Sequence, residues 1–104
     1  MTDRLPQRVE LLNRRLELVA GISTLNAEAL RHIQSLGAVE IEILRIELEV
    51  QRNGGGEELA QNLREAEGNA DAIRAAQEDC EARIISVEME VEEIDLLLAS
   101  IDEE

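Results

Sequence analysis

An apolar repeat with alternating steps of four and three residues fills the second half of this 104-residue chain. From residue 59 to residue 101, every position of the repeat is apolar except Gln77. The members are Leu59, Leu63, Ala66, Ala70, Ile73, Gln77, Cys80, Ile84, Val87, Val91, Ile94, Leu98 and Ile101. This spacing sets one apolar stripe along a helix and is typical of a coiled-coil seam. The repeat therefore predicts a long helix that packs lengthwise against another helix.

The first half of the chain carries the same spacing, again with one polar member, His32. The members are Leu18, Ile22, Leu25, Ala29, His32, Leu36, Val39, Ile43, Ile46 and Val50. Upstream, this frame meets Arg15 and Arg8. A shifted apolar stripe is available there, made of Leu5, Val9, Leu12, Leu16 and Val19. The shift predicts a local change in the phase of the supercoil.

The segment Asn53-Gly54-Gly55-Gly56 separates the two halves. Glycine adopts left-handed backbone conformations without a steric penalty, so the segment predicts a helix stop and a turn over residues 53–56. Glu57 and Glu58 follow directly, where negative charge suits the first turn of a new helix. A turn this short requires the two helices to run antiparallel.

The first helix is expected to begin near Pro6, which suits a first helical turn, with Thr2 or Asp3 as its cap. We predict one all-α domain over residues 1–104, an antiparallel two-helix hairpin that self-associates into a helical bundle. Its helices should cover about 4–52 and about 57–102.

Two stretches, 39–43 and 87–91, alternate apolar residues with glutamate, as a half-buried strand would. Both lie in phase inside the longer four-three repeats. Glutamate is also a good helix former and is depleted in strands. These stretches are therefore predicted to be helical.

The two repeats can be aligned antiparallel by pairing positions whose numbers sum to 109, beginning with Val50 opposite Leu59. The two polar members, His32 and Gln77, then face each other, although neither was used to set the alignment. A polar pair inside an apolar seam fixes register at some cost in stability. We interpret His32 and Gln77 as a register-setting polar layer.

Charge is distributed unevenly between the two halves. Residues 1–52 contain seven arginines and eight acids, whereas residues 57–104 contain three arginines and 16 acids. In the hairpin, the arginines of the N-terminal segment should lie beside the acids of residues 88–102. The arginines concerned are Arg4, Arg8, Arg14 and Arg15.

Apolar residues also occur outside the seam. On the first helix they form a second stripe, Leu30, Ile33, Gly37, Ile41, Leu44 and Leu48, roughly opposite the seam. On the second helix, Ile85, Met89, Leu96 and Leu97 lie off the seam, and we include Ile85 and Met89 with the six residues of the stripe. These eight residues are the candidate interaction surface. We expect the surface to bind another copy of the chain or another protein.

No residue pattern points to catalysis, to a cofactor or to a metal site. The chain has no Phe, Trp or Tyr and no phosphate-binding loop, and its formal charge is −14. This charge disfavours direct binding to nucleic acid and to anionic membranes. His32 lacks a nucleophile or a second titrating group, and Cys80 is expected to be a small buried side chain.

The expected function is therefore that of a non-enzymatic scaffold, spacer or adaptor in the cytoplasm, or in a virion if a phage encodes the chain. Arginine without lysine suggests a GC-rich bacterial or phage source. One alternative is an acidic inhibitor of the kind phages encode, which occupies a basic nucleic-acid-binding groove of another protein. The acidity of residues 57–104 motivates this alternative.

A second alternative follows from the acids Glu57 and Glu58 at the tip of the hairpin. In architecture, this arrangement resembles the bacterial transcript-cleavage factors, and Asn69-Ala70-Asp71 resembles one of their motifs. The resemblance implies a coiled-coil finger that carries metal-binding acids into RNA polymerase.

Overall fold

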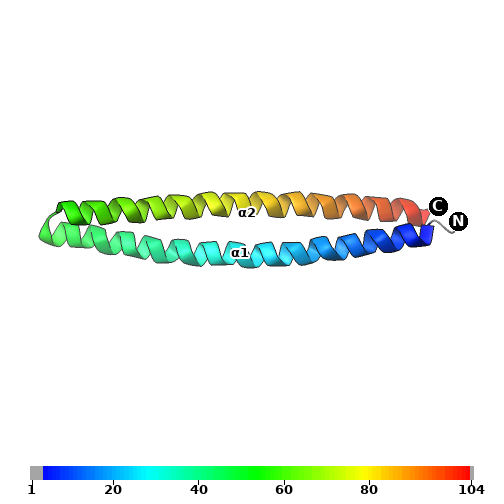
Figure 1. The fold of residues 1–104 in the computed structure, drawn as a ribbon, viewed down its shortest axis with the longest axis horizontal. Helices are drawn as coiled ribbons and strands as arrows, with labels where there is room; N and C mark the ends of the chain where they lie inside the picture. The colour runs from blue at the N-terminus through cyan, green and yellow to red at the C-terminus, as the bar shows by residue number, and fades with distance from the viewer. Residues whose placement is uncertain (1–3, 104) are drawn as a thin grey trace. The chain divides into compact units, whose positions relative to one another are not determined.

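The computed structural model describes residues 4–103, which form two helices. Helix α1 is Arg4–Asn53 and helix α2 is Glu57–Glu103 (Figure 1). The two long helices pack against each other, and the described residues contain no strand, so the prediction of an all-α two-helix hairpin is confirmed. The stretches 39–43 and 87–91 are helical, as expected. The expected caps Thr2 and Asp3 lie outside the described residues.

Residues 54–56 join the two helices. Gly54 has a φ of +76°, a left-handed conformation that side chains with a Cβ rarely adopt. Its N–H donates to the carbonyl of Val50 at 2.8 Å, and the N–H of Ala60 donates to the carbonyl of Gly56 at 3.0 Å. The first bond closes the last turn of α1 and the second opens the first turn of α2. Each bond satisfies one of the backbone groups that have no partner within the helix at that end.

The tertiary contacts divide the chain into two compact units. In the first unit, the described residues are 4–27 of α1 and 80–103 of α2. The second unit is Glu28–Asp79, which contains the end of α1, the connection and the start of α2. A single domain over residues 1–104 stays a prediction.

In the second unit, the predicted repeat is the packed face of both helices. Ile46, Ala66 and Ala70 are buried, with Ile46 only 4% exposed. The other members in this unit are half-buried: Ala29, His32, Leu36, Val39, Ile43, Val50, Leu59, Leu63, Ile73 and Gln77. The alternation of four and three residues keeps one face of each helix toward the other, which explains this distribution.

The first unit shows the same distribution. Leu18, Cys80 and Ile94 are buried. The remaining members are half-buried: Ile22, Leu25, Ile84, Val87, Val91, Leu98 and Ile101. Every position that the two repeats assigned to the packed face is therefore shielded from solvent in its own unit.

The predicted phase shift near the N-terminus is wrong. The residues of the shifted stripe, Leu5, Val9, Leu12, Leu16 and Val19, are all exposed. The half-buried residues are Arg8, Leu11 and Arg15, which continue the frame of Leu18. Arginine fits this face because its aliphatic stem covers apolar surface while its guanidinium reaches an acid. Asp102 and Asp95 on α2 supply those acids.

We expect Gly54→Ala to destabilise the hairpin by about 1–2 kcal/mol, because alanine is strained at a positive φ. Gly56→Ala is the matched control: Gly56 has no positive φ, and an added Cβ would meet no atom within 4 Å. Urea unfolding followed by circular dichroism measures both changes. Equal free energies of unfolding for the two variants would contradict the importance of the Gly54 conformation.

Candidate functional site

Helix α1 has a second apolar face in the second unit, which we call the second-unit stripe. Its large side chains are between 50% and 69% exposed. They are Leu30, Ile33, Ile41, Leu44 and Leu48. At 100° per residue this stripe lies roughly 140° around the helix from the seam, so α2 cannot cover it. The stripe is solvent-exposed where the sequence predicted an interaction surface.

Gly37 lies within the second-unit stripe and is half-buried. A Cβ added at Gly37 would meet no atom within 4 Å, so the packing within one chain does not require glycine there. Glycine in a helix interior costs about 1 kcal/mol relative to alanine. The missing side chain leaves a shallow position in the middle of an otherwise bulky apolar face.

A further apolar face lies on α1 in the first unit, and we call it the first-unit stripe. It consists of Leu5, Val9, Leu12, Leu16 and Val19, which are 41–70% exposed. Sequence reasoning assigned these residues to the seam and so missed them as surface. Asp95 and Asp102, positioned across from Arg15 and Arg8, were the signal that could have identified them.

On α2, Ile85 and Met89 are each 58% exposed. In the first unit they line an open groove with Ile22, Glu88, Val91 and Glu92. Four apolar side chains and two carboxylates line this groove. Ile85 and Met89 are therefore accessible, as the predicted interaction surface requires.

Ion pairs join the two helices of the first unit. Arg15 Nε donates to Asp95 Oδ1 at 2.6 Å, and Arg8 pairs with Asp102. The hydrogen bond from Arg15 lowers the pKa of Asp95 below its ordinary value, and the same bond raises the pKa of Arg15. The paired residue numbers sum to 110 in both cases, within one residue of the alignment predicted from the sequence.

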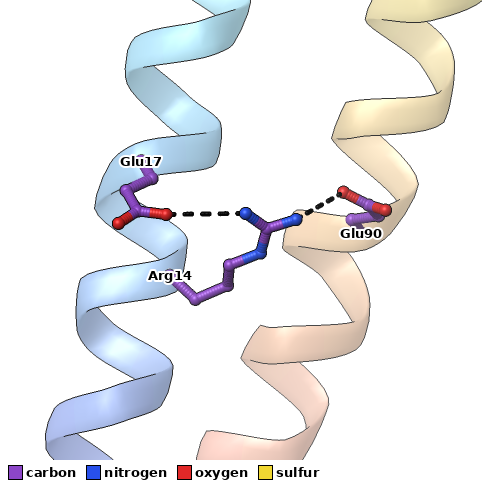
Figure 2. A network of polar contacts seen from close by, with 3 residues as sticks. All are labelled: Arg14, Glu17 and Glu90. Carbon is purple, nitrogen blue, oxygen red and sulfur yellow. Dashed lines mark hydrogen bonds and ion pairs between the residues drawn. The ribbon is translucent and has the colours of Figure 1, made fainter.

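Arg14 forms a third link between the helices of this unit (Figure 2). Its Nη1 lies 3.5 Å from Glu17 Oε2 on α1, and its Nη2 lies 3.8 Å from Glu90 Oε2 on α2. The expectation that the N-terminal arginines lie beside the acids of residues 88–102 is thereby confirmed for Arg8, Arg14 and Arg15.

The two polar members of the seam, His32 and Gln77, are both half-buried in the second unit. His32 Nε2 lies 3.8 Å from Glu28 Oε1, one turn earlier in the same helix. No buried side-chain nitrogen or oxygen among the described residues lacks a hydrogen-bond partner. The role of His32 and Gln77 as a register-setting layer stays a prediction.

Cys80 is 2% exposed and forms no disulfide. Its thiol donates to the backbone carbonyl of Leu25 at 3.3 Å across the first unit. Cys80 therefore has the surroundings expected of a small buried side chain.

Glu57 and Glu58 are exposed in the first turn of α2. Within residues 4–103, no three or more His, Cys, Asp or Glu side chains gather closely enough to hold a metal ion. Neither helix, over the same residues, has a segment long and apolar enough to cross a membrane. No family model, no curated protein and no solved structure matches the chain.

The lowered pKa of Asp95 predicts a pH-dependent contribution to stability. Because the folded-state pKa lies below the unfolded one, the contribution is present above the ordinary aspartate pKa of about 3.9 and is lost as the pH falls through the folded value. Asp95→Asn should therefore be less stable than the wild type at pH 7, and the difference should be lost as the pH falls through the folded-state pKa of Asp95.

Asp71→Asn is the control for this experiment, because Asp71 pairs with Arg74 in its own helix, at 3.2 Å. It removes the same charge without removing an ion pair between the helices. Thermal unfolding as a function of pH measures all three proteins. A pH-independent difference between Asp95→Asn and the wild type would contradict the assignment.

The polar layer can be tested by a double-mutant cycle on His32 and Gln77. Leaving a buried polar group without its partner costs about 1–3 kcal/mol, whereas replacing both partners by apolar residues is nearly neutral or stabilising. The double variant His32→Leu with Gln77→Leu should therefore have a higher free energy of unfolding than the sum of the two single changes predicts. Additive free energies of unfolding would show that the two residues do not interact.

Proposed function

We propose that this chain is a non-enzymatic interaction protein, a coiled-coil hairpin that acts as scaffold, spacer or adaptor in a larger assembly. One observation carries the proposal: α1 has two apolar faces, of which α2 covers one. A helix that is apolar on two sides is typical of the interior of a bundle, where two neighbours cover it.

The coiled-coil character is supported by the burial pattern. Shielded positions recur at steps of four and three along both helices, and the intervening positions are mostly exposed. The positive φ of Gly54 supports a glycine turn at residues 54–56, whereas Asn53, which the sequence placed in the turn, is the last residue of α1. With the second face of α1 uncovered, this hairpin is a unit for assembly into a bundle.

The docking surfaces that we propose are two, one in each unit. In the second unit the surface is the second-unit stripe together with Gly37, and in the first unit it is Ile85 and Met89 of α2. Exposed aliphatic side chains that recur at helical spacing fit the face of another helix. Because these side chains are 50–69% exposed, burying each of them fully would contribute about 1–2 kcal/mol before the cost of association. The partner is therefore a protein, either a copy of this chain or a different one.

An acidic inhibitor of a basic groove is the second candidate. Its support is the charge of α2, in which residues 57–103 contain 15 acids and three arginines, a net charge of −12. Binding of that kind weakens as salt screens the charges, whereas binding through the apolar stripe tolerates salt. Affinity measured between low and high ionic strength separates the two candidates.

We expect Ile41→Glu combined with Leu48→Glu to weaken protein complexes of this chain by at least about a hundredfold while leaving its helicity unchanged, since two exposed apolar contacts are lost. Ser35→Glu combined with Ala38→Glu adds the same charge at exposed positions outside the stripe. This control should bind like the wild type.

The assay combines light scattering of the pure chain with capture from extracts of the source cells, followed by reconstitution with the purified partner. Circular dichroism verifies that each variant remains helical. If the stripe variant forms the same complexes as the control, the stripe is not the docking face and the proposed function fails.

A further inference from the structure

We propose that the occupant of the stripes is a second copy of the chain, with the α1 helices antiparallel. The first-unit stripe of each copy then binds the second-unit stripe of the other. This inference rests on the proposed function and names the partner of its docking face.

The frame of the first-unit stripe continues into Leu30, Ile33 and Leu44 of the second-unit stripe, whereas Ile41 and Leu48 each lie one residue beyond a frame position. Steps of four and three residues from Leu5 to Gly37 lead from the first-unit stripe into the second-unit stripe. The ten positions are Leu5, Val9, Leu12, Leu16, Val19, Ser23, Asn26, Leu30, Ile33 and Gly37. None is charged, although a third of the chain is charged. This second repeat is a seam with the same spacing as the first, and no residue of α2 is available to cover it.

Charge favours a contact between two α1 helices over one that involves α2. Residues 4–53 contain seven arginines and seven acids, so α1 has no net charge, whereas α2 has a net charge of −12 over residues 57–103. Two copies that meet through α1 keep their acidic helices on the outside. A contact through α2 would bring two strongly negative surfaces together.

Charge within α1 also sets the direction of the pair. Residues 4–27 contain four arginines and two glutamates, a net charge of +2. Residues 28–53 contain three arginines and five glutamates, a net charge of −2. An antiparallel pair sets each positive segment beside a negative one, whereas a parallel pair matches like with like.

The four-three spacing allows antiparallel registers whose paired numbers sum to a multiple of seven, such as 42, 49 or 56. We adopt a sum of 49, because only that register sets the two polar members of the frame, Ser23 and Asn26, opposite each other. The apolar pairs are Leu5 with Leu44, Leu12 with Gly37, Leu16 with Ile33, and Val19 with Leu30.

This register explains a glycine that the packing within one chain does not. Gly37 faces Leu12 of the other copy and gives that side chain room, whereas within one chain glycine is not needed there. Ser23 faces Asn26 near the symmetry axis. One position is mismatched, because Val9 faces Glu40.

The test exchanges one apolar pair for a charge pair in the full-length chain. Leu16→Glu and Ile33→Arg are made singly and together, and the dissociation constant is measured by sedimentation equilibrium. Each single variant should dissociate at least about tenfold more readily than the wild type, because an unpaired charge enters the seam. The dissociation constant of the double variant should be at least about tenfold lower than that of either single variant. In both halves of the dimer, the introduced carboxylate of one copy then faces the introduced guanidinium of the other.

The matched control is Leu16→Glu combined with Leu44→Arg, which has the same net charge but places the arginine opposite Leu5. Recovery by the first pair and not by the control supports the antiparallel second copy in this register. Equal recovery by both pairs would overturn the register, and no recovery by either would overturn the antiparallel arrangement.

A wild-type chain that stays monomeric up to about 100 μM would overturn the second copy as partner. In that case, capture of another protein that depends on Ile41 and Leu48 would still support the proposed function. Loss of both self-association and stripe-dependent capture would reject the two together, so the failures are distinguishable.

Discussion

Each helix of this chain can bury only one narrow face, because a pair of helices gives each member a single neighbour. The buried side chains among the described residues are Leu18, Ile46, Ala66, Ala70, Cys80 and Ile94. Half of these are alanine or cysteine, so the packed face removes little apolar surface from water. Long helices depend on tertiary packing for most of their stability. The seam therefore has to hold the hairpin while the remaining apolar residues of α1 stay exposed, and these exposed residues are the basis of the proposed function.

Charge and exposed apolar surface are both distributed unevenly between the two helices. Helix α1 is neutral over residues 4–53 and apolar on two sides, whereas α2 is strongly acidic outside the seam. In the first unit, Arg8, Arg14 and Arg15 offset part of that acidity through ion pairs across the hairpin. The pKa of Asp95 is lowered by one of these pairs. Helix α2 also exposes Ile85, Met89, Leu96 and Leu97 among its acids. Because α1 has no net charge, we propose α1 as the helix on which another helix docks.

The packed faces were predictable from the sequence because a four-three repeat directly encodes which side of a helix is shielded. The helix ends at Asn53 and Glu57 were predictable because three glycines cannot continue a helix without cost. The path of the seam at Arg8 and Arg15 was not, since apolar periodicity alone prefers leucine to arginine and ignores the acid across the helix pair. That error also hid the first-unit stripe. The contact of His32 with Glu28 depends on a side-chain rotamer, which the repeat does not encode.

We propose that α1 has one face shielded within the chain and another that becomes shielded on assembly. The most direct measurement is methyl NMR with a soluble paramagnetic agent, recorded on dilute and on concentrated protein. The Ile46 and Ile94 methyls should be protected at every concentration, because they are buried in the hairpin. Those of Leu16 and Ile33 should be attenuated in dilute protein and protected in concentrated protein. Equal attenuation of Ile46 and Ile33 in dilute protein, or protection of Leu16 at every dilution, would contradict this claim.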